Sequence, residues 1–574
     1  MRTKIMLSIL AAWMFGCICE PDNENSAAKI QPVPLERIVT KGELALRIEK
    51  NFDRLEEGKY RPDSVFLTEE QSGGWPGDTE GRTILGLTLD ARASKREPVY
   101  LQEIIERIPR HLNREGYMGP IYEDAVNEQQ LSGNGWMLRG LCEYYEWKKD
   151  EKVLPLIASI VNNLFVKGKG FYRKYPIDPD AWKSMKGAEA GSIQKTADGW
   201  MLSSDIGHVF VGMAGAIHAY KHLRSEALKE VIEEMMSRFL ETDLVGIRAQ
   251  THAALTACRG LIRYAEITGE RKYVDEAAKR WQWYRQNGMT ENYENYNWFG
   301  RLDTWTEACA VIDSYILAVQ LWQHTREAQY LHDAELIYYN AICHLQRHNG
   351  GFGCDNCPGK ATQDSCLKVH IPEAHWCCTM RGGEGLPRVA EYSCFAEGSD
   401  VYIPFFHENE LSLPAGLRMR QHTAWPFEGK VRFVIEENTA GAIALHLRIP
   451  LRTTRHRLRY NGKEYPFDRE KQFAVLKRKF NAGDEIEWTF DPVVEISGAR
   501  TGNTEQGQVE VFYGPLMLGC EHGEAVKLTE KDSIIPVGTA SFKLEGKEIY
   551  FTPLYHLMDP AVWNNTGYKK QILF

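Results

Sequence analysis

The first two thirds of the chain carry apolar residues at helical spacing. Residues 153–170 repeat them at Leu156, Ile157, Ile160 and Val161, and the pattern stops at Gly168. The same spacing recurs in residues 41–55, 227–240, 251–269, 271–288, 306–325 and 328–351. Roughly a dozen such segments, joined by loops rich in Gly and Asn, predict a helical domain.

These helical segments are of two alternating kinds. Residues 134–145 and 207–220 begin with small, aromatic or polar residues, whereas the segments between them are plainly amphipathic. A helix that is apolar all round is buried, and an amphipathic one covers it. The alternation therefore predicts a ring of six inner and six outer helices.

After residues 398–413 the apolar pattern changes to a period of two. Residues 429–437, 441–450, 456–465 and 483–496 read as short alternating strands separated by Gly, Asn and Asp turns. This pattern predicts an antiparallel β-sandwich. We therefore expect an α+β multidomain protein, with a helical domain over 35–395 and one or more sandwich domains over 396–574.

Composition narrows the class of partner. The chain has 574 residues, of which 43% are hydrophobic and 26% charged, and 69 basic against 78 acidic residues give a net charge of −9. No run of Lys and Arg stands out, which argues against nucleic acid as a partner. The 15 Trp and 26 Tyr suit flat sugar faces, although they suit many protein cores as well.

The N-terminal segment resembles an export signal. Arg2 and Lys4 precede an apolar run over 5–15, and Gly16 stands directly before Cys17. Residues 1–17 therefore predict a lipoprotein-type signal of a Gram-negative bacterium, with Cys17 lipidated; simple cleavage nearby is the alternative. We expect a periplasmic or outer-membrane location after secretion across the inner membrane, with membrane contact only through that anchor.

Thirteen cysteines are unevenly spread. Cys142, Cys258 and Cys343 lie in helical patterns and are most simply buried hydrophobes. Cys377 and Cys378 are adjacent, and Cα atoms about 3.8 Å apart lie below the usual span of a disulfide. These two thiols pair elsewhere, pack as small hydrophobes, or bind one soft metal together.

A second pair of potential ligands precedes them. Glu307 and Cys309 stand at the start of a helical pattern, where Thr304-x-x-Glu307 also fits a capping box. Residues two apart on a regular helix point to opposite sides, so both reach one metal only in an extended first turn. Three thiolates and one carboxylate would suit zinc, although the spacing fits no standard zinc finger.

A proton donor is available in the loop ahead of this helix. Residues 289–305 are polar and aromatic and contain Glu291 and Glu294. Either carboxyl group can act as a general acid. The alternative is that both are solvated loop carboxylates.

Four motifs in this order resemble glycoside hydrolase family 127, the β-L-arabinofuranosidase family. They are residues 306–315, 375–378, 483–490 and 513–521, reading TEACAVIDSY, HWCC, GDEIEWTF and YGPLMLGCE. The resemblance implies an (α/α)6 barrel followed by β-sandwich modules. It also implies that Glu307, Cys309, Cys377 and Cys378 hold a zinc ion and that Cys377 is the nucleophile.

The resemblance extends to the reaction. It implies a retaining exo-acting hydrolase in which Cys377 forms a thioglycosyl intermediate, with Glu291 preferred to Glu294 as acid and base. His252 matches a histidine that contacts the sugar, and Asp78 and Glu80 lie where relatives have an acidic pocket segment. Trp136 and His208 are expected to begin inner helices and to line the cleft.

The sequence also departs from the family pattern. Thr379, Met380 and Arg381 replace a segment with Pro and Asn, which puts the preference for arabinose in doubt. Arg381, Arg301 or Arg82 can bind a carboxylate on an acidic pentofuranose, unless each forms an ordinary salt bridge. We expect an oligosaccharide substrate from pectin or arabinan side chains.

Three other cysteines lie outside the family core. We predict a disulfide between Cys354 and Cys357 in a loop beside the cleft, with Cys366 as the uncertain member. Two further functions remain open at this stage. One is a polysaccharide lyase, because helical toroids followed by sandwiches also occur there, and the other is a glycan-binding protein with a structural zinc.

Overall fold

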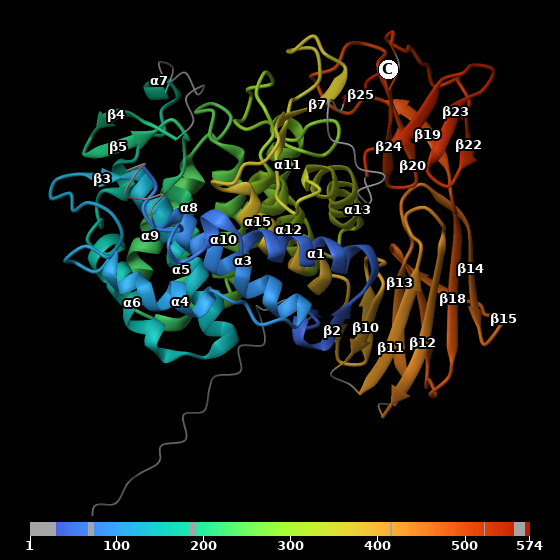
Figure 1. Cartoon of the computed structure of the whole chain (residues 1–574), viewed down its shortest axis with the longest axis horizontal. Helices are drawn as coiled ribbons and strands as arrows, with labels where there is room; N and C mark the ends of the chain where they lie inside the picture. The colour runs from blue at the N-terminus through green and yellow to red at the C-terminus, as the bar shows by residue number, and fades with distance from the viewer. Residues whose placement is uncertain are drawn as a thin grey trace, which may run out of the picture.

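The computed structural model describes residues 30–66, 74–182, 191–413, 416–439, 441–521, 523–555 and 569–574. The predicted signal segment over 1–17, with Cys17, lies outside them. Helices fill one side of the molecule and β-sheets the other (Figure 1). In the described residues, no helix combines the length and the apolar character that crossing a membrane requires.

Six helices form the predicted inner ring, in which each packs against the next and the last closes on the first. They are α3 (Asp78–Ser94), α5 (Glu128–Lys148), α8 (Val209–Leu223), α10 (Thr251–Thr268), α12 (Ala308–Thr325) and α15 (Cys378–Glu391). Nearly every side chain of these helices is buried, as their continuous apolar and small-residue sequences require.

Six amphipathic helices pack around that ring. They are α1 (Gly42–Leu55), α4 (Leu101–Arg107), α6 (Leu154–Ile160), α9 (Glu226–Glu241), α11 (Lys272–Asn287) and α13 (Ala328–Ile337). In α9 the buried residues share one helix face; they are Leu228, Val231, Ile232, Met235, Met236 and Phe239. The predicted six-plus-six barrel is confirmed.

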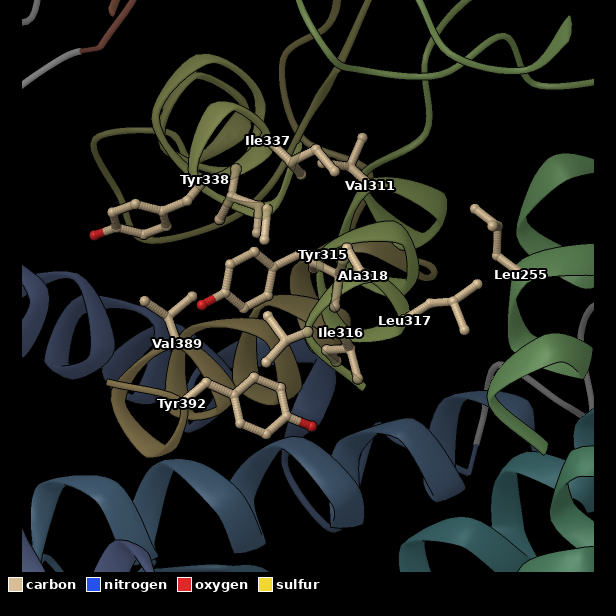
Figure 2. Close-up of a cluster of buried hydrophobic side chains, with 14 of the residues drawn as sticks. Leu255, Val311, Tyr315, Ile316, Leu317, Ala318, Ile337, Tyr338, Val389 and Tyr392 are labelled. Atoms are coloured by element: carbon tan, nitrogen blue, oxygen red, sulfur yellow. The ribbon is translucent and has the colours of Figure 1, made fainter. Parts of the chain in front are cut away.

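The core between α12, α13 and α15 is aromatic and aliphatic (Figure 2). Tyr315 of α12 lies between Tyr338 and Tyr392, with ring centroids 6.4 and 6.3 Å away. This packing fixes α12 and α15 relative to each other. Their first turns are therefore held at fixed positions at the end of the barrel.

The N-termini of several inner helices meet at one end of the barrel. Asp78 opens α3, while His208, Gln250, Glu307 and Cys377 are the residues that precede α8, α10, α12 and α15. A helix N-terminus carries a partial positive charge and unpaired amide groups. This end of the barrel therefore favours anionic groups such as thiolates and carboxylates.

Two sheets follow the barrel. The six-stranded sheet has the order β1 (Gln31–Pro32), β8 (Phe395–Glu397), β9 (Asp400–Ile403), β13 (Ile443–Arg448), β17 (Phe473–Arg478) and β16 (Asp468–Glu470). The seven-stranded sheet has the order β15 (Lys463–Glu464), β14 (Thr453–Tyr460), β18 (Glu485–Pro492), β12 (Lys430–Asn438), β11 (Leu417–Thr423), β10 (Asn409–Ser412) and β2 (Ile38–Thr40).

These sheets differ from a purely antiparallel sandwich in two ways. β9 and β13 run parallel, and β1 and β2 come from the segment that precedes the barrel. The two sheets meet at Trp488 of β18, whose Nε1 donates to the carbonyl of Arg448 in β13 at 3.0 Å. Where the sequence predicts a border near residue 396, α15 ends at Glu391 and β8 begins at Phe395.

A third sheet leads back to the barrel. Its strands are β22 (Ile534–Gly538), β23 (Ser541–Leu544), β24 (Tyr550–Pro553), β21 (Leu516–Cys520), β25 (Lys569–Gln571), β7 (Cys366–Ile371) and β6 (Cys354–Asp355), with β19 (Val494–Gly498) and β20 (Val509–Tyr513) at its side. β6 and β7 belong to the chain between α13 and α15. This sheet therefore extends to the open end of the barrel. A small sheet of β3 (Val126–Asn127), β5 (Trp200–Ser203) and β4 (Ile193–Ala197) lies on the helical side.

Candidate active site

A cavity of about 310 Å³ opens at the end of the barrel where the inner helices begin. Three tryptophans, Trp75, Trp305 and Trp376, contribute to its wall. Its polar lining consists of Asp78, Thr79, Glu80, Arg82, Asp205, His208, Gln250, Asn297, Glu307, Cys354, Cys377 and Cys378. Aromatic faces beside clustered polar groups are typical of a site that binds a small polar ligand.

The four predicted metal ligands converge beneath this cavity. Donor atoms of Glu307, Cys309, Cys377 and Cys378 all lie within 4.8 Å of one another. The Sγ atom of Cys378 is 3.4 Å from that of Cys377 and 3.9 Å from that of Cys309, and Cys377 Sγ is 3.8 Å from Glu307 Oε1. Ligands of a tetrahedral zinc with Zn–S near 2.3 Å are separated by about 3.5–3.8 Å. The residues present therefore fit zinc.

Local backbone geometry makes this convergence possible. Glu307 precedes α12 with an extended conformation, φ −136° and ψ 116°, so its side chain is turned toward Cys309 rather than away from it. The alternative role as a capping box is wrong within the described chain, because the Glu307 side chain makes no capping hydrogen bond. Thr304 Oγ1 instead donates to the carbonyl of Arg301.

Electrostatics at the four donors call for a cation. Burial, together with the nearby Cys378, raises the pKa of Glu307 to about 8. Hydrogen bonds from its neighbours hold the pKa of Cys378 well below its usual range, whereas contact with Cys309 and Cys378 raises the pKa of Cys377. Four converging acidic donors, three of them buried, cannot all ionise without a compensating positive charge. A soft divalent ion would supply that charge and would hold the thiols as thiolates.

Arg82 is a fixed cation beside this cluster. Its Nη1 donates to Cys309 Sγ at 3.4 Å and its Nε donates to Asp78 Oδ1 at 2.7 Å. The guanidinium also lies 4.0 Å above the ring of Trp136. Arg82 is therefore held from three sides, and its ion pair with Asp78 is buried.

A polar chain of three residues crosses the cavity. Gln250 Nε2 lies 3.3 Å from both Asp205 Oδ1 and Glu307 Oε2, and its amide oxygen contacts His208 Nε2. The amide of Gly191 donates to Asp205 Oδ2 at 2.8 Å. Burial raises the pKa of Asp205 to about 7, so this carboxyl group carries a proton at slightly acid pH.

Of the six residues predicted to contact the substrate, three line the cavity and three are buried below it. Asp78, Glu80 and His208 line the cavity, as predicted. Trp136, His252 and Arg381 instead lie one layer below, buried. Trp136 does not begin its helix but lies two turns into α5, because that helix starts at Glu128.

That lower layer is a charged network. Asp313 accepts from His252 Nδ1 at 2.8 Å and from Arg381 Nη2 at 2.7 Å. Arg381 also pairs with Glu384. The ring of His252 stacks on Trp136 at 5.7 Å. These side chains support the floor of the cavity, and the ordinary salt bridge is the role the structure gives Arg381.

Glu291 lies away from the cavity. Its carboxylate accepts from the backbone amides of Arg500 at 3.1 Å and Thr501 at 2.8 Å, in the loop between β19 and β20. Although burial opposes it, hydrogen bonding to Glu510 and the charge of Arg500 lower the pKa of Glu291. Because its pKa is lowered, the Glu291 carboxyl group is ionised near neutral pH and has no proton to give to a leaving group.

Glu294 is buried behind the segment that contains Thr306 and Glu307, which we call the ligand loop. It lies 3.4 Å from His344 Nδ1, which is 2.8 Å from Asp355 Oδ2. Burial, with the charge of Asp355, raises the pKa of Glu294 to about 7. The backbone of Asp355 pairs with Thr306, the neighbour of Glu307, so this cluster braces the ligand loop.

The predicted disulfide between Cys354 and Cys357 is wrong, because both thiols are free and buried. Cys354 lines the cavity and hydrogen-bonds Cys378, a contact that raises the pKa of Cys354. Cys357 Sγ donates to the carbonyl of Asn295 at 3.7 Å. Cys366 is free as well, in β7.

Arg301 is the remaining predicted carboxylate binder. It pairs with Asp303 at 3.0 Å, outside the cavity lining. The sequence patterns did not predict several residues that line the cavity, among them Asp205, Gln250 and Trp376. Asp205 and Gln250 each lie shortly before an inner helix, so their polar side chains at helix starts are the signal that marks them.

Two domain descriptions match the sequence. The catalytic domain of β-L-arabinofuranosidases of family GH127 matches residues 239–391, and the GH127 middle domain matches residues 400–492. The first of these contains all four converging donors. A search of curated proteins found no match.

Solved structures share the whole fold. A GH127 β-arabinofuranosidase superposes with a TM-score of 0.69 at 15% identity, covering 96% of this chain and 98% of its own. A structure described as a glycoside hydrolase gives 0.67 at 15% identity, covering 96% and 98%. A GH127 β-L-arabinofuranosidase from Geobacillus stearothermophilus T6 gives 0.67 at 13% identity, covering 93% and 99%.

Proposed function

We propose, from the premise that this chain is a glycoside hydrolase belonging to family GH127, that it is a retaining, exo-acting enzyme that releases a furanose sugar. Because the matching domain descriptions are those of a hydrolase family, we prefer a hydrolase to a polysaccharide lyase or a glycan-binding protein. The observation that carries the proposal is the convergence of Glu307, Cys309, Cys377 and Cys378 under the cavity.

Zinc is the proposed cofactor because three sulfur donors and one carboxylate suit it better than the harder calcium or magnesium ions. When bound, it supplies charge that keeps the thiols ionised and fixes their positions. Among the four donors, Cys377 is partly exposed, whereas the other three are buried. Cys377 is therefore the thiol that a sugar can reach.

The proposed reaction has two steps at the anomeric carbon. The Cys377 sulfur attacks that carbon, a C–S bond forms, the glycosidic C–O bond breaks, and an acid gives its proton to the leaving oxygen. The same residue, now a base, takes a proton from water. The water oxygen attacks from the opposite face, the C–S bond breaks, and the sugar leaves with net retention.

Asp205 is the proposed acid and base. It lines the cavity, its carboxyl group carries a proton up to about pH 7 because burial raises its pKa, and Gln250 connects it to the metal-ligand Glu307. Glu291 and Glu294, expected from the family spacing, lie against the β19–β20 loop and behind the ligand loop. A general acid must lie within hydrogen-bond distance of the leaving oxygen, and neither glutamate belongs to the lining of the cavity.

A neutral pentofuranose such as β-L-arabinofuranose is the proposed sugar, from arabinan or pectin side chains. The cavity lining contains Asp78, Glu80, Asp205 and Glu307 but one arginine, Arg82. That arginine is already paired with Asp78 and Cys309, and Arg381 with Asp313. An acidic sugar would therefore face carboxylates without a free cation.

The decisive experiment compares four cysteine variants. Cys378→Ser and Cys309→Ser are expected to lose zinc and activity. Cys377→Ser is expected to keep substantial zinc, through three remaining ligands, while its turnover on an aryl β-L-arabinofuranoside falls below detection. Cys354→Ser is the matched control, since its thiol touches Cys378 but lies outside the ligand set, and it should keep both.

Two results would contradict this function. Turnover retained in Cys377→Ser would exclude the thiol as nucleophile. Full activity after prolonged treatment with a strong chelator, with zinc shown absent by elemental analysis, would exclude the metal. A screen of other furanosides and of arabinan and pectin fragments would then define the sugar.

We also propose export and anchoring at Cys17, which rests on residues 1–17 alone. Expressed in a Gram-negative host, the full chain should carry a labelled fatty acid and sediment with membranes. Cys17→Ser should remove the label and release the protein. An unlabelled wild-type chain would contradict the anchor.

A further inference from the structure

A second group of metal-type ligands lies at the opposite end of the barrel from the cavity. Cys142 and Glu146 stand one turn apart near the end of α5, and His218 and His222 stand one turn apart near the end of α8. Residues four apart share one helix face. Each helix therefore presents a pair of donor side chains to the other.

Three of these donor atoms already converge, and Glu146 lies beside two of them. Glu146 Oε1 accepts from His218 Nε2 at 2.9 Å and from His222 Nε2 at 3.0 Å. Donor atoms of Cys142, His218 and His222 lie within 4.8 Å of one another. Ligands around a tetrahedral zinc with bonds of 2.0–2.3 Å are about 3.3–3.8 Å apart, so a small outward shift admits the ion.

Glycines bring these two helices close enough. A Cβ atom on Gly215 of α8 would lie 2.3 Å from the carbonyl oxygen of Gly135 in α5. Backbones in such contact leave little freedom in the angle between the helices. The cluster near their C-terminal ends is thus held at a fixed spacing.

Neighbouring charges leave the three donors and Glu146 available. Glu143, which also lies close to His218, is engaged by Arg92 at 3.1 Å and Arg388 at 3.0 Å, so we exclude it as a ligand. Lys221 Nζ contacts Glu146 at 2.9 Å but is 45% exposed, so it can move into solvent.

We infer that Cys142, His218 and His222 form a second zinc site, which joins α5 to α8 at the end of the barrel opposite the cavity, with Glu146 as the hydrogen-bond partner of both imidazoles. One sulfur and two imidazoles select zinc over calcium and magnesium. Because the site joins two helices at the end of the barrel away from the proposed active site, its role is structural. This site and the proposed active site share no residue.

Metal stoichiometry tests the site independently of catalysis. The purified full chain is expected to bind two zinc ions by elemental analysis after dialysis. His222→Ala should bind one, and keep its activity. Zinc affinity at the second site should fall more than about 100-fold, beyond the 10–100-fold that losing an outer partner of a ligand costs.

A matched histidine provides the control. His324 lies near the end of α12 and contacts Glu266 at 3.2 Å, outside any cluster of three donors in the described residues. His324→Ala should keep both ions. A Cys309→Ser/Cys378→Ser double variant should keep one ion, and cobalt bound to it should show sulfur-to-metal charge transfer that Cys142→Ser abolishes.

The second site would be overturned by either of two results. One is a wild-type chain that binds a single zinc ion at saturating concentration. The other is a double variant that binds none although its circular dichroism is unchanged. If His222→Ala does not fold, the double variant alone decides, because its second site is intact.

Discussion

Arg82 Nη1 lies 3.4 Å from Cys309 Sγ. The same guanidinium is held by Asp78 at 2.7 Å and by the face of Trp136 at 4.0 Å. A permanent cation is thereby fixed beside one sulfur of the proposed metal site. Hydrogen bonds to a ligand sulfur orient it and tune its affinity for the metal.

Replacing Arg82 should therefore weaken the metal centre. For Arg82→Gln we expect zinc affinity to fall about 10–100-fold, with activity falling in parallel at limiting zinc. Competition with a chromogenic chelator measures the affinity. Arg92→Gln on the same helix, which loses ion pairs to Glu36 and Glu143, is the control and should leave affinity unchanged. Equal zinc affinity in the two variants would contradict the role of Arg82.

Asp205→Asn tests the proton donor. The amide keeps the size of the side chain but cannot give a proton, so we expect kcat to fall about 10²–10⁴-fold on alkyl or sugar leaving groups. Aryl glycosides with acidic phenols should suffer far less, because their leaving oxygen needs no proton. Initial rates over a series of leaving groups measure this dependence.

Glu291→Gln and Glu294→Gln are the matched comparisons for Asp205→Asn. Both carboxyl groups are buried, but neither belongs to the lining of the cavity. We expect any loss in these variants to be independent of the leaving group. A leaving-group dependence in Glu291→Gln, and none in Asp205→Asn, would transfer the role to Glu291.

The pH profile should report Asp205. Because burial raises the pKa of Asp205 to about 7, the carboxyl group is protonated below that pH and ionised above it. The proton donor is therefore lost on the alkaline side, and kcat/KM should fall about tenfold per pH unit above about pH 7. In Asp205→Asn this limb should disappear. An unchanged limb in the variant would assign it to another group.

The same shift affects stability in a defined direction. A buried carboxyl group with a pKa of about 7 binds its proton between about pH 4 and 7, where the unfolded chain has released it. Its contribution to the free energy of unfolding is thus complete below about pH 4 and is lost as the pH rises to about 7.

Trp376 should matter for binding rather than turnover. Its side chain is 48% exposed, lines the cavity and precedes Cys377. We expect Trp376→Ala to raise KM about 5–10-fold, equivalent to about 1–1.4 kcal/mol, with kcat within about twofold. Tyr550→Ala, also 48% exposed but in β24, is the control. A loss of kcat with unchanged KM would contradict a binding role.

Local patterns predicted the barrel, and they also predicted the four side chains whose donor atoms converge in the structure. Helical periodicity marks inner and outer helices because burial on all sides and burial on one side leave different residues on a helix face. The Glu307-x-Cys309 and Cys377-Cys378 motifs are short. Each stands at the start of a helix, α12 or α15, and these two helices are neighbours in the ring. Helical periodicity and these short motifs are both local, because each is contained in one helix or at its start.

The errors arise where distant segments meet. Glu291 matches a family spacing, yet Arg500 and Thr501 from the β19–β20 loop bind its carboxylate. Arg381 was predicted to bind a substrate carboxylate, yet its guanidinium pairs with Asp313 of α12 below the cavity. Asp205 carries no motif, since its position depends on how six helices close into a ring.

The pairing of β2 with β10 has a consequence for how the molecule is made. Val39 pairs with Glu410, so a strand that leaves the ribosome early has no neighbour until several hundred further residues have been translated. Loop closure over such a separation is slow relative to local helix formation. Until then the nascent polypeptide exposes an unpaired edge, and a chaperone that masks residues 38–40 during translation should raise the yield of active protein.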